Sequence, residues 1–259
     1  MGIVNVTPDS FSDGGRYASV EAAVLEARRL MDEGADIVDI GGESTRPGAA
    51  PVPVAEELER VLPVLEALAA SPVPLSIDTY KPAVMTAALA AGASLVNDVK
   101  ALREPGALDV LGGSDAAVCL MHMQGAPQTM QVDPHYEDVV GEVCTFLRER
   151  VAACEAAGID RARIVIDPGF GFGKTKAHNI TLLRHLGRLT ALGLPVLAGL
   201  SRKSVLGAIT ARDVAERVHS SVAGALIAVY RGAGIVRVHD VRATRDALAV
   251  YEAIESNHD

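Results

Sequence analysis

The stretch MGIVNVTPDSFSDGG (residues 1–15) begins as a strand and then turns abruptly polar. Residues 2–6, GIVNV, have the apolar, β-branched composition of a buried strand. The residues that follow are polar and turn-forming, and they leave no room for a helix directly after the strand. A strand that ends this way is typical of one that delivers a binding loop, provided that other strands of the chain end in the same way.

The same alternation runs through the whole chain, with short strand-like segments followed by longer amphipathic ones. The predicted strands are residues 2–6, 36–40, 74–78, 94–98, 117–121, 163–167, 195–200 and 235–239. The predicted helices are residues 19–33, 54–69, 82–91, 105–111, 135–157, 177–192, 203–233 and 241–256. Glycines that follow several of these helices are typical helix-stop residues, at Gly34, Gly92, Gly158, Gly193 and Gly234.

Eight strands that alternate with helices over about 250 residues predict a single (β/α)8 barrel domain covering residues 1–259. A doubly wound open sheet is the alternative architecture. The number of strands, and the lack of a G-x-G-x-x-G sequence after the first one, favour the barrel. Because the first strand begins at residue 1, we expect a short N-terminal segment to precede it in the natural chain.

Composition limits the classes of function. The chain has a formal net charge of -9, which argues against a nucleic-acid partner but allows a small anionic substrate in a locally basic cleft. Its three cysteines form no C-x-x-C pair, so neither a disulfide framework nor a zinc site is indicated. No uncharged apolar run reaches the roughly 18–20 residues of a membrane span, and no signal-peptide pattern is present. We therefore expect a reduced, cytoplasmic protein.

Four of the predicted strands end in carboxylate or amide side chains, at Asp39, Asp78, Asn97 and Asp167. In a β/α barrel the C-terminal ends of all strands meet on one face, where binding sites lie. A carboxylate there can accept two parallel N–H bonds from a flat, nitrogen-rich heterocycle. Each residue alone could instead cap the next helix. The four together favour a binding site.

Strand six continues into DPGFGFGK (residues 167–174), which lacks the spacing of a phosphate-binding P-loop. Its glycines allow the backbone to approach a ligand closely. Two of the four phenylalanines of the chain lie here, and we expect Phe170 and Phe172 to act as stacking or lid residues.

Basic residues occur at strands seven and eight, where barrels commonly bind phosphate. Arg202 and Lys203 follow strand seven, and Arg237 and His239 lie on strand eight. Arg237 and His239 are two residues apart on an extended strand, so both should point to the same side. The alternative is an internal ion pair between these cations and the aspartates. The loops TPDSFSDGG and GGESTRPGA are predicted lids, and His122 is interpreted as a locally bonded histidine without a chemical role.

Eight motifs occur in order at the strand ends: NVTPDSFSDGG, GGESTRPGA, SIDTYKP, LVNDV, LMHMQG, DPGFGFGKT, GLSRKS and RVHDV. Together they resemble the dihydropteroate synthase family of bacterial folate biosynthesis over nearly the whole chain. The resemblance implies condensation of 6-hydroxymethyl-7,8-dihydropterin pyrophosphate with p-aminobenzoate to give 7,8-dihydropteroate and pyrophosphate. It also implies that sulfonamides compete for the p-aminobenzoate site.

The resemblance also assigns residues by position. Pterin-binding residues would be Asp39, Asp78, Asn97, Met121, Asp167 and Lys203. Pyrophosphate-binding residues would be Asn5, Arg237 and His239, with Asn5 also contacting Mg²⁺. Residues on the p-aminobenzoate side would be Thr45, Arg46, Pro47, Phe172 and Ser204. The catalytic residues would be Asp78, Lys203, Arg237 and His239.

No arrangement for a covalent nucleophile is found in the sequence, so a dissociative substitution is expected, in which Mg²⁺, Arg237 and His239 stabilise the departing pyrophosphate. The resemblance further suggests a homodimer, through the apolar segment VAGALIAVY (residues 222–230) of the last helices. Two alternatives remain. One is the pterin-binding domain of a folate-dependent methyltransferase, which would not need both lid motifs. The other is a non-catalytic pterin-binding paralogue, which would have lost lid or anion-site residues.

Overall fold

The computed structural model describes residues 1–6, 15–46 and 48–255, with the backbone only at residues 15–19. Eight strands lie close to the predicted positions: β1 (Gly2–Asn5), β2 (Val38–Gly41), β3 (Leu75–Asp78), β4 (Leu95–Asp98), β5 (Ala117–Met121), β6 (Ile164–Asp167), β7 (Leu197–Ala198) and β8 (Ile235–Val236). The last two are the shortest, and the predicted runs at 195–200 and 235–239 continue beyond them as extended chain.

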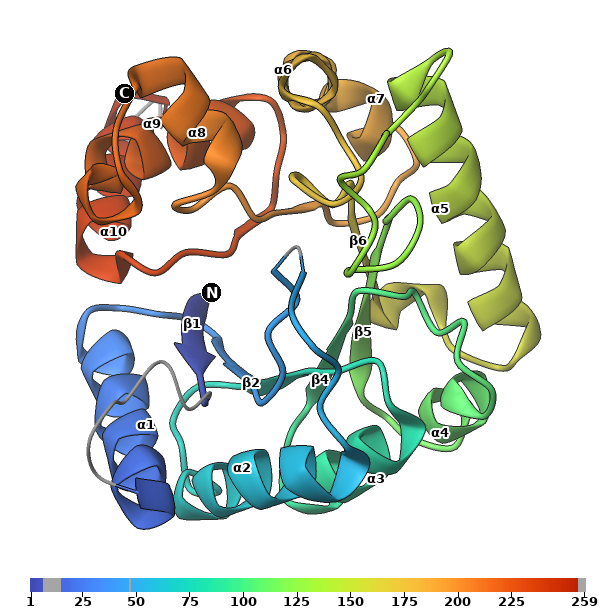
Figure 1. Ribbon diagram of the computed structural model, residues 1–259, viewed down its shortest axis with the longest axis vertical. Helices are drawn as coiled ribbons and strands as arrows, with labels where there is room; N and C mark the ends of the chain where they lie inside the picture. Colours follow the sequence, from blue (N-terminus) through green and yellow to red (C-terminus); the bar gives the residue numbers. More distant parts are fainter. Residues whose placement is uncertain (7–14, 47, 256–259) are drawn as a thin grey trace.

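The strands close into a ring. β1 to β6 form one parallel sheet in sequence order, and β7 pairs with β8 in parallel. A parallel bridge between Ile166 and Val196 joins β6 to the segment before β7, and another between Gly2 and Val238 joins β1 to the segment after β8. These links confirm the predicted (β/α)8 barrel, and Figure 1 shows the helices arranged around the strands.

The surrounding helices are α1 (Gly15–Asp32), α2 (Val54–Ala67), α3 (Pro82–Ala90), α4 (Ala107–Gly112), α5 (Val139–Ala156), α6 (Lys176–Arg184), α7 (Gly187–Thr190), α8 (Ser204–Thr210), α9 (Val218–Tyr230) and α10 (Val241–Glu255). Two predicted helices are in fact divided. The segment 177–192 forms α6 and α7, and the segment 203–233 forms α8, a short 3-10 turn and α9. The second break follows α8 at Ala211, whose φ of 53° is left-handed.

Helix ends also differ in detail from the prediction. α5 starts four residues late, because the Asp138 carboxylate caps it by accepting the backbone N–H of Val140. The helix-stop prediction is wrong at Gly234, because the left-handed residue after α9 is Gly232, with a φ of 96°. The other four glycines named as stops have positive φ angles and so are confirmed.

Alternation along the strands separates two cores. On β4, Val96 points outward into the large core between barrel and helices, whereas Leu95 points inward. Inward apolar residues form a separate plug in the barrel, made of Met1, Leu95, Cys119, Val165 and Leu197. The next inward position on β4 is Asn97, and on β6 it is Asp167. The barrel interior is therefore apolar in one layer and polar at the C-terminal ends of the strands.

Among the residues that the structure describes, no helix has the length and apolar character needed to cross a membrane.

Candidate active site

Three polar side chains, from β2, β4 and the segment directly after β8, meet inside the C-terminal end of the barrel. The Asp39 carboxylate on β2 accepts hydrogen bonds from Asn97 Nδ2 at 3.1 Å and from Arg237 Nε at 2.6 Å. Asp39 is fully buried. The second oxygen of Asp39, Oδ1, has no hydrogen-bond partner among the described residues. Ser76 on β3, which pairs in register with Asp39, has a buried hydroxyl that also lacks a partner among them. An unpaired buried carboxylate oxygen is the acceptor that a ligand N–H would satisfy.

Asp78 lies at the end of β3 and shares Arg237 with Asp39. Arg237 Nη2 donates to Asp78 Oδ2 at 2.8 Å. Burial raises the pKa of Asp78 to about 7, although the charge of Arg237 opposes the shift and that of Asp39 adds to it. The internal ion pair that the sequence left as an alternative is thus present, and it brings β2, β3 and the end of β8 together.

Asp167 and Lys203 both bond to the backbone of the loop after β6. The Asp167 carboxylate accepts the backbone N–H of Gly169 at 2.7 Å and so shapes the turn that begins DPGFGFGK. Lys203 immediately precedes α8, and its ammonium donates to the carbonyl of Phe170 and lies 4.6 Å from the centre of the Phe172 ring. Burial lowers the pKa of Lys203 to about 8, opposed by the charge of Asp167.

An apolar wall borders this polar group. Met121, at the end of β5, is buried in a small cluster with Val99, Met123 and Met130, against which Tyr80 and Phe172 pack. The roles expected for Met121 and Phe172 stay predictions. The expectation for Phe170 is wrong, because its ring is fully buried in the main core and only its backbone carbonyl meets Lys203.

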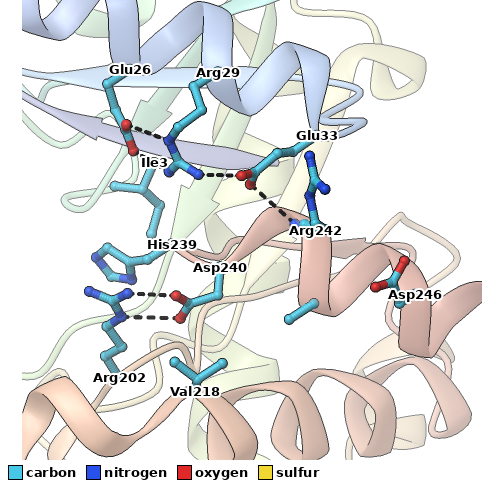
Figure 2. A pocket seen from close by; sticks show the side chains of 11 residues that line it. Ile3, Glu26, Arg29, Glu33, Arg202, Val218, His239, Asp240, Arg242 and Asp246 are labelled. Carbon is cyan, nitrogen blue, oxygen red and sulfur yellow. Dashed lines mark hydrogen bonds and ion pairs between the residues drawn. The ribbon is translucent and has the colours of Figure 1, made fainter.

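His239 lies apart from the Arg237 cluster. Its Nδ1 is 3.0 Å from Ser201 Oγ, and its ring lines a cavity of about 490 Å³ between α1 and α10. Figure 2 shows His239 beside Arg202, which pairs with Asp240. Burial, followed by the charges of Arg202 and Arg237, lowers the pKa of His239 to about 4. The imidazole is therefore neutral near pH 7 and can offer a hydrogen bond but no charge.

The remaining predicted residues lie at the end of β1, in the segment after β2 and at the start of α8. Asn5 is half-buried at the end of β1 and pairs in register with Gly41. Thr45 is half-buried, and Arg46 and Ser204 are exposed. Pro47 and most of the first predicted lid, residues 7–14, lie outside the described residues.

Two groups of charged residues escaped the sequence analysis. Lys81, just beyond β3, is buried against Glu43 and Glu57, and both acids pair with it. Lys174 is buried at the end of DPGFGFGK, with its ammonium 2.9 Å from His122 Nδ1 and 2.9 Å from the carbonyl of Phe172. Lys81, Glu43 and Lys174 all lie in the quoted motifs. Their charge within loops that adjoin strand ends was the available signal.

Comparisons with known proteins show the family of this chain. The profile of the pterin-binding enzyme family matches residues 1–239. The dihydropteroate synthase of Neisseria meningitidis serogroup C is 56% identical over 262 residues, which cover 99% of this chain and 93% of the relative. The dihydropteroate synthase of Escherichia coli K12 is 50% identical, covering 98% of this chain and 90% of the relative.

Solved structures show the same likeness. Xanthomonas albilineans dihydropteroate synthase with 4-aminobenzoic acid is 60% identical with a TM-score of 0.94, covering 99% of this chain and 92% of that one. The same enzyme with 7,8-dihydropteroate is 57% identical with a TM-score of 0.91, covering 99% of this chain and 93% of that one. The Yersinia pestis dihydropteroate synthase with a sulfonamide drug is 50% identical with a TM-score of 0.94, covering 99% of this chain and 94% of that one.

Proposed function

The chain belongs to the dihydropteroate synthase family of pterin-binding enzymes, so it is a transferase that forms 7,8-dihydropteroate, and we propose how its residues carry out that reaction. The substrates are 6-hydroxymethyl-7,8-dihydropterin pyrophosphate and p-aminobenzoate, and the second product is pyrophosphate. The observation that carries the proposal is the polar layer of Asp39, Asn97, Asp78 and Arg237 above the apolar plug of the barrel.

The pterin ring binds in this polar layer. Asp39 Oδ1 is a buried acceptor without a partner among the described residues. Asp167 lies at the end of β6, two strands along the sheet from β4, which carries Asn97. Carboxylate oxygens match the N–H groups along one edge of the pterin. Met121 and the apolar cluster around it supply the contact for the flat face of the ring.

Arg237 holds the aspartates and the pyrophosphate at the same time. A guanidinium has five N–H donors, and only Nε and one N–H of Nη2 are used by Asp39 and Asp78. Nη1 has no partner among the described residues, so it can donate to a phosphate oxygen. His239, neutral near pH 7, adds a hydrogen bond, and Asn5 lies at the end of the strand next to β2.

Mg²⁺ fits the residues present as a metal held mainly by the substrate. The described residues contain no group of three or more His, Cys, Asp or Glu side chains that could form a protein cage. Mg²⁺ commonly binds through one or two protein oxygens together with substrate phosphates, and the Asn5 carboxamide offers one such oxygen. When bound, the ion would supply positive charge to the leaving pyrophosphate.

The reaction proceeds by dissociative substitution. The bond between the pterin methylene carbon and the pyrophosphate oxygen breaks, and its electron pair leaves with pyrophosphate, whose charge Arg237 stabilises. The cationic methylene faces the carboxylates of Asp78 and Asp167. The amine nitrogen of p-aminobenzoate then forms the new C–N bond and loses its proton to the released pyrophosphate. Thr45, Arg46, Pro47, Phe172 and Ser204 hold p-aminobenzoate, and sulfonamides compete with it there.

A homodimer is proposed through the last helices. Ile227 and Tyr230 on α9 are 45% and 69% exposed, and Val250 and Ile254 on α10 are 61% and 72% exposed. Residues three or four apart lie on one helix face, and α9 packs against α10. The two pairs of apolar side chains therefore belong to neighbouring helices and suit a self-association surface.

The proposed function is tested by measuring pyrophosphate release and identifying the second product by mass spectrometry. We expect release only when the pterin pyrophosphate, p-aminobenzoate and Mg²⁺ are all present, with one dihydropteroate formed for each pyrophosphate. Pyrophosphate release that does not depend on p-aminobenzoate, or a product other than dihydropteroate, would contradict the proposal.

A further inference from the structure

Lys81 occupies a position that the proposed chemistry does not use. It immediately precedes α3, just beyond Asp78 and the end of β3. Its ammonium pairs with the carboxylates of Glu43 and Glu57 and donates to the carbonyl of Val52 at 2.5 Å. The Lys81 side chain is only 11% exposed, that of Glu43 7% and that of Glu57 1%.

Lys81 thereby joins both ends of one loop segment. Glu43 precedes residues 44–51 and Val52 follows them, and the same ammonium holds both. The Glu43 carboxylate completes the closure by accepting the backbone N–H of Val52 at 3.2 Å. Fixing the ends of a loop removes conformations that a ligand would otherwise have to exclude when it binds.

The Glu43 carboxylate also connects the loop to the apolar cluster around Met121. Glu43 Oε1 accepts a hydrogen bond from the Tyr80 hydroxyl at 3.0 Å. The Tyr80 ring, like that of Phe172, packs against the cluster that contains Met121. The loop ends are thus attached to the strand that carries Asp78 and to the apolar side of the polar layer.

We infer that Lys81 and Glu43 are positioning residues, which hold the segment 44–51 so that Thr45 and Arg46 meet p-aminobenzoate, and this inference rests on the proposed function. Neither residue touches the reacting atoms. Their contribution is to keep the loop close to its binding conformation before the second substrate arrives. A purely structural role, the attachment of α2 to β3 through Glu57, would lower stability without distinguishing one substrate from the other.

The test compares Lys81→Met with the control Lys100→Met. Lys100 also lies against Tyr80, with its ammonium 3.7 Å from the ring centre, but it pairs with Glu104 instead of the loop. We expect Lys81→Met to raise the KM for p-aminobenzoate about ten- to a hundred-fold. The Kd for the pterin pyrophosphate should stay within about two-fold, and the inhibition constants of sulfonamides should rise in parallel with KM. Lys100→Met should leave all three values near those of the wild type.

Hydrogen exchange of the backbone amides in residues 44–51 provides a second readout. It should become faster in Lys81→Met and stay unchanged in Lys100→Met. Because Lys81→Met leaves two buried carboxylates without their cation and could prevent folding, Glu43→Gln is measured beside it. This variant keeps the shape and one acceptor oxygen, and it should raise the KM for p-aminobenzoate several-fold.

The outcomes separate the two proposals. A wild-type protein that forms no dihydropteroate would contradict the proposed function. An active wild type, together with folded Lys81 or Glu43 variants whose KM for p-aminobenzoate is unchanged, would overturn the positioning role alone. Equal losses of affinity for both substrates would also overturn it, because they would indicate general destabilisation of the barrel end.

Discussion

The guanidinium of Arg237 donates to the Asp78 carboxylate over 2.8 Å, while its Nε donates to Asp39 over 2.6 Å. One arginine directly after β8 therefore pairs with carboxylates on β2 and β3, which lie beyond the link between β8 and β1. The sequence left open whether Arg237 binds an anion or forms an internal ion pair. The number of donors allows both, so a substitution should affect stability and catalysis together.

We expect Arg237→Ala to lower the free energy of unfolding by about 3–5 kcal/mol, because it leaves the buried Asp39 carboxylate and Asp78 without their cation. Turnover should also fall by about ten- to a thousand-fold at a temperature where the variant is folded, because charge on the departing pyrophosphate is no longer stabilised. Denaturant unfolding and steady-state rates on the same preparation measure the two effects.

Arg245→Ala is the matched control. Arg245 pairs with Asp36 at 3.5 Å on the surface, with side chains 47% and 75% exposed, and exposed pairs contribute little. Its loss should leave stability and turnover nearly unchanged. Normal turnover by folded Arg237→Ala would refute the pyrophosphate role and leave only the ion pair.

Asp167→Asn should weaken pterin binding while the barrel still folds. The carboxylate accepts the Gly169 N–H at 2.7 Å, and an amide can keep that bond through its oxygen. Its other group then presents a donor to the ligand where an acceptor is required. A mismatch of this kind costs about 1–3 kcal/mol, or about 5- to 150-fold in affinity. Calorimetry with the pterin substrate measures the change, and an unchanged Kd would remove Asp167 from the site.

The strands could be predicted because their signal is local. Residues 117–121 agree with β5 residue for residue, since an apolar run between polar segments has few other uses in a chain of this type. The polar strand ends could also be predicted, because once the strands are placed, barrel topology alone brings Asp39, Asp78 and Asn97 to one face. Neither inference needs knowledge of which side chains touch.

Contacts between distant residues could not be predicted in this way. Arg237 and His239 alternate on one extended segment, yet Arg237 turns to the aspartates and His239 to Ser201 and the cavity beside α1. Alternation fixes the direction of a side chain only while the strand is regular, and β8 ends at Val236. Lys81 and its two acids are far apart in sequence, so only the fold reveals their pairing.

The raised pKa of Asp78 predicts how stability depends on pH. The ordinary value is 3.8 and the value in the fold is about 7, so the folded state holds a proton over this interval that the unfolded state has lost. Stability from this group therefore decreases as pH rises from about 4 to about 7 and is constant above. Asp78→Asn removes the effect, so the unfolding free energy of the variant minus that of the wild type should increase across the same interval.

Denaturant unfolding of both proteins at several pH values between about 4 and 8 measures this difference. Replacing the carboxylate beside Arg237 with an amide adds an offset that does not depend on pH to a first approximation. The slope of the difference against pH therefore tests the prediction. A difference that stays flat, or that decreases as pH rises, would show that Asp78 is ionised throughout and that Arg237 outweighs burial.

Gly169 lies where the turn after β6 passes close to His122, the residue that follows β5. Its φ is 67°, and a Cβ atom there would lie 1.9 Å from the backbone carbonyl oxygen of His122. His122 also donates its N–H to the carbonyl of Asp167 at 2.9 Å. An added methyl group would therefore push apart the ends of β5 and β6, which carry Met121 and Asp167.

Gly169→Ala should consequently destabilise the protein and weaken pterin binding. Gly158→Ala should destabilise the protein by a smaller amount and leave pterin binding unchanged. Gly158 has a φ of 85° but nothing within 4 Å of the added Cβ, so only the left-handed strain of about 1–2 kcal/mol applies there. Gly169→Ala carries similar strain and must also displace a backbone carbonyl, so we expect a loss at least about 2 kcal/mol larger. Urea unfolding measures both variants, and calorimetry at a temperature where both are folded measures pterin affinity. Equal destabilisation of the two, with normal pterin affinity in Gly169→Ala, would mean that the β5 end yields without cost and that the close approach has no part in shaping the site.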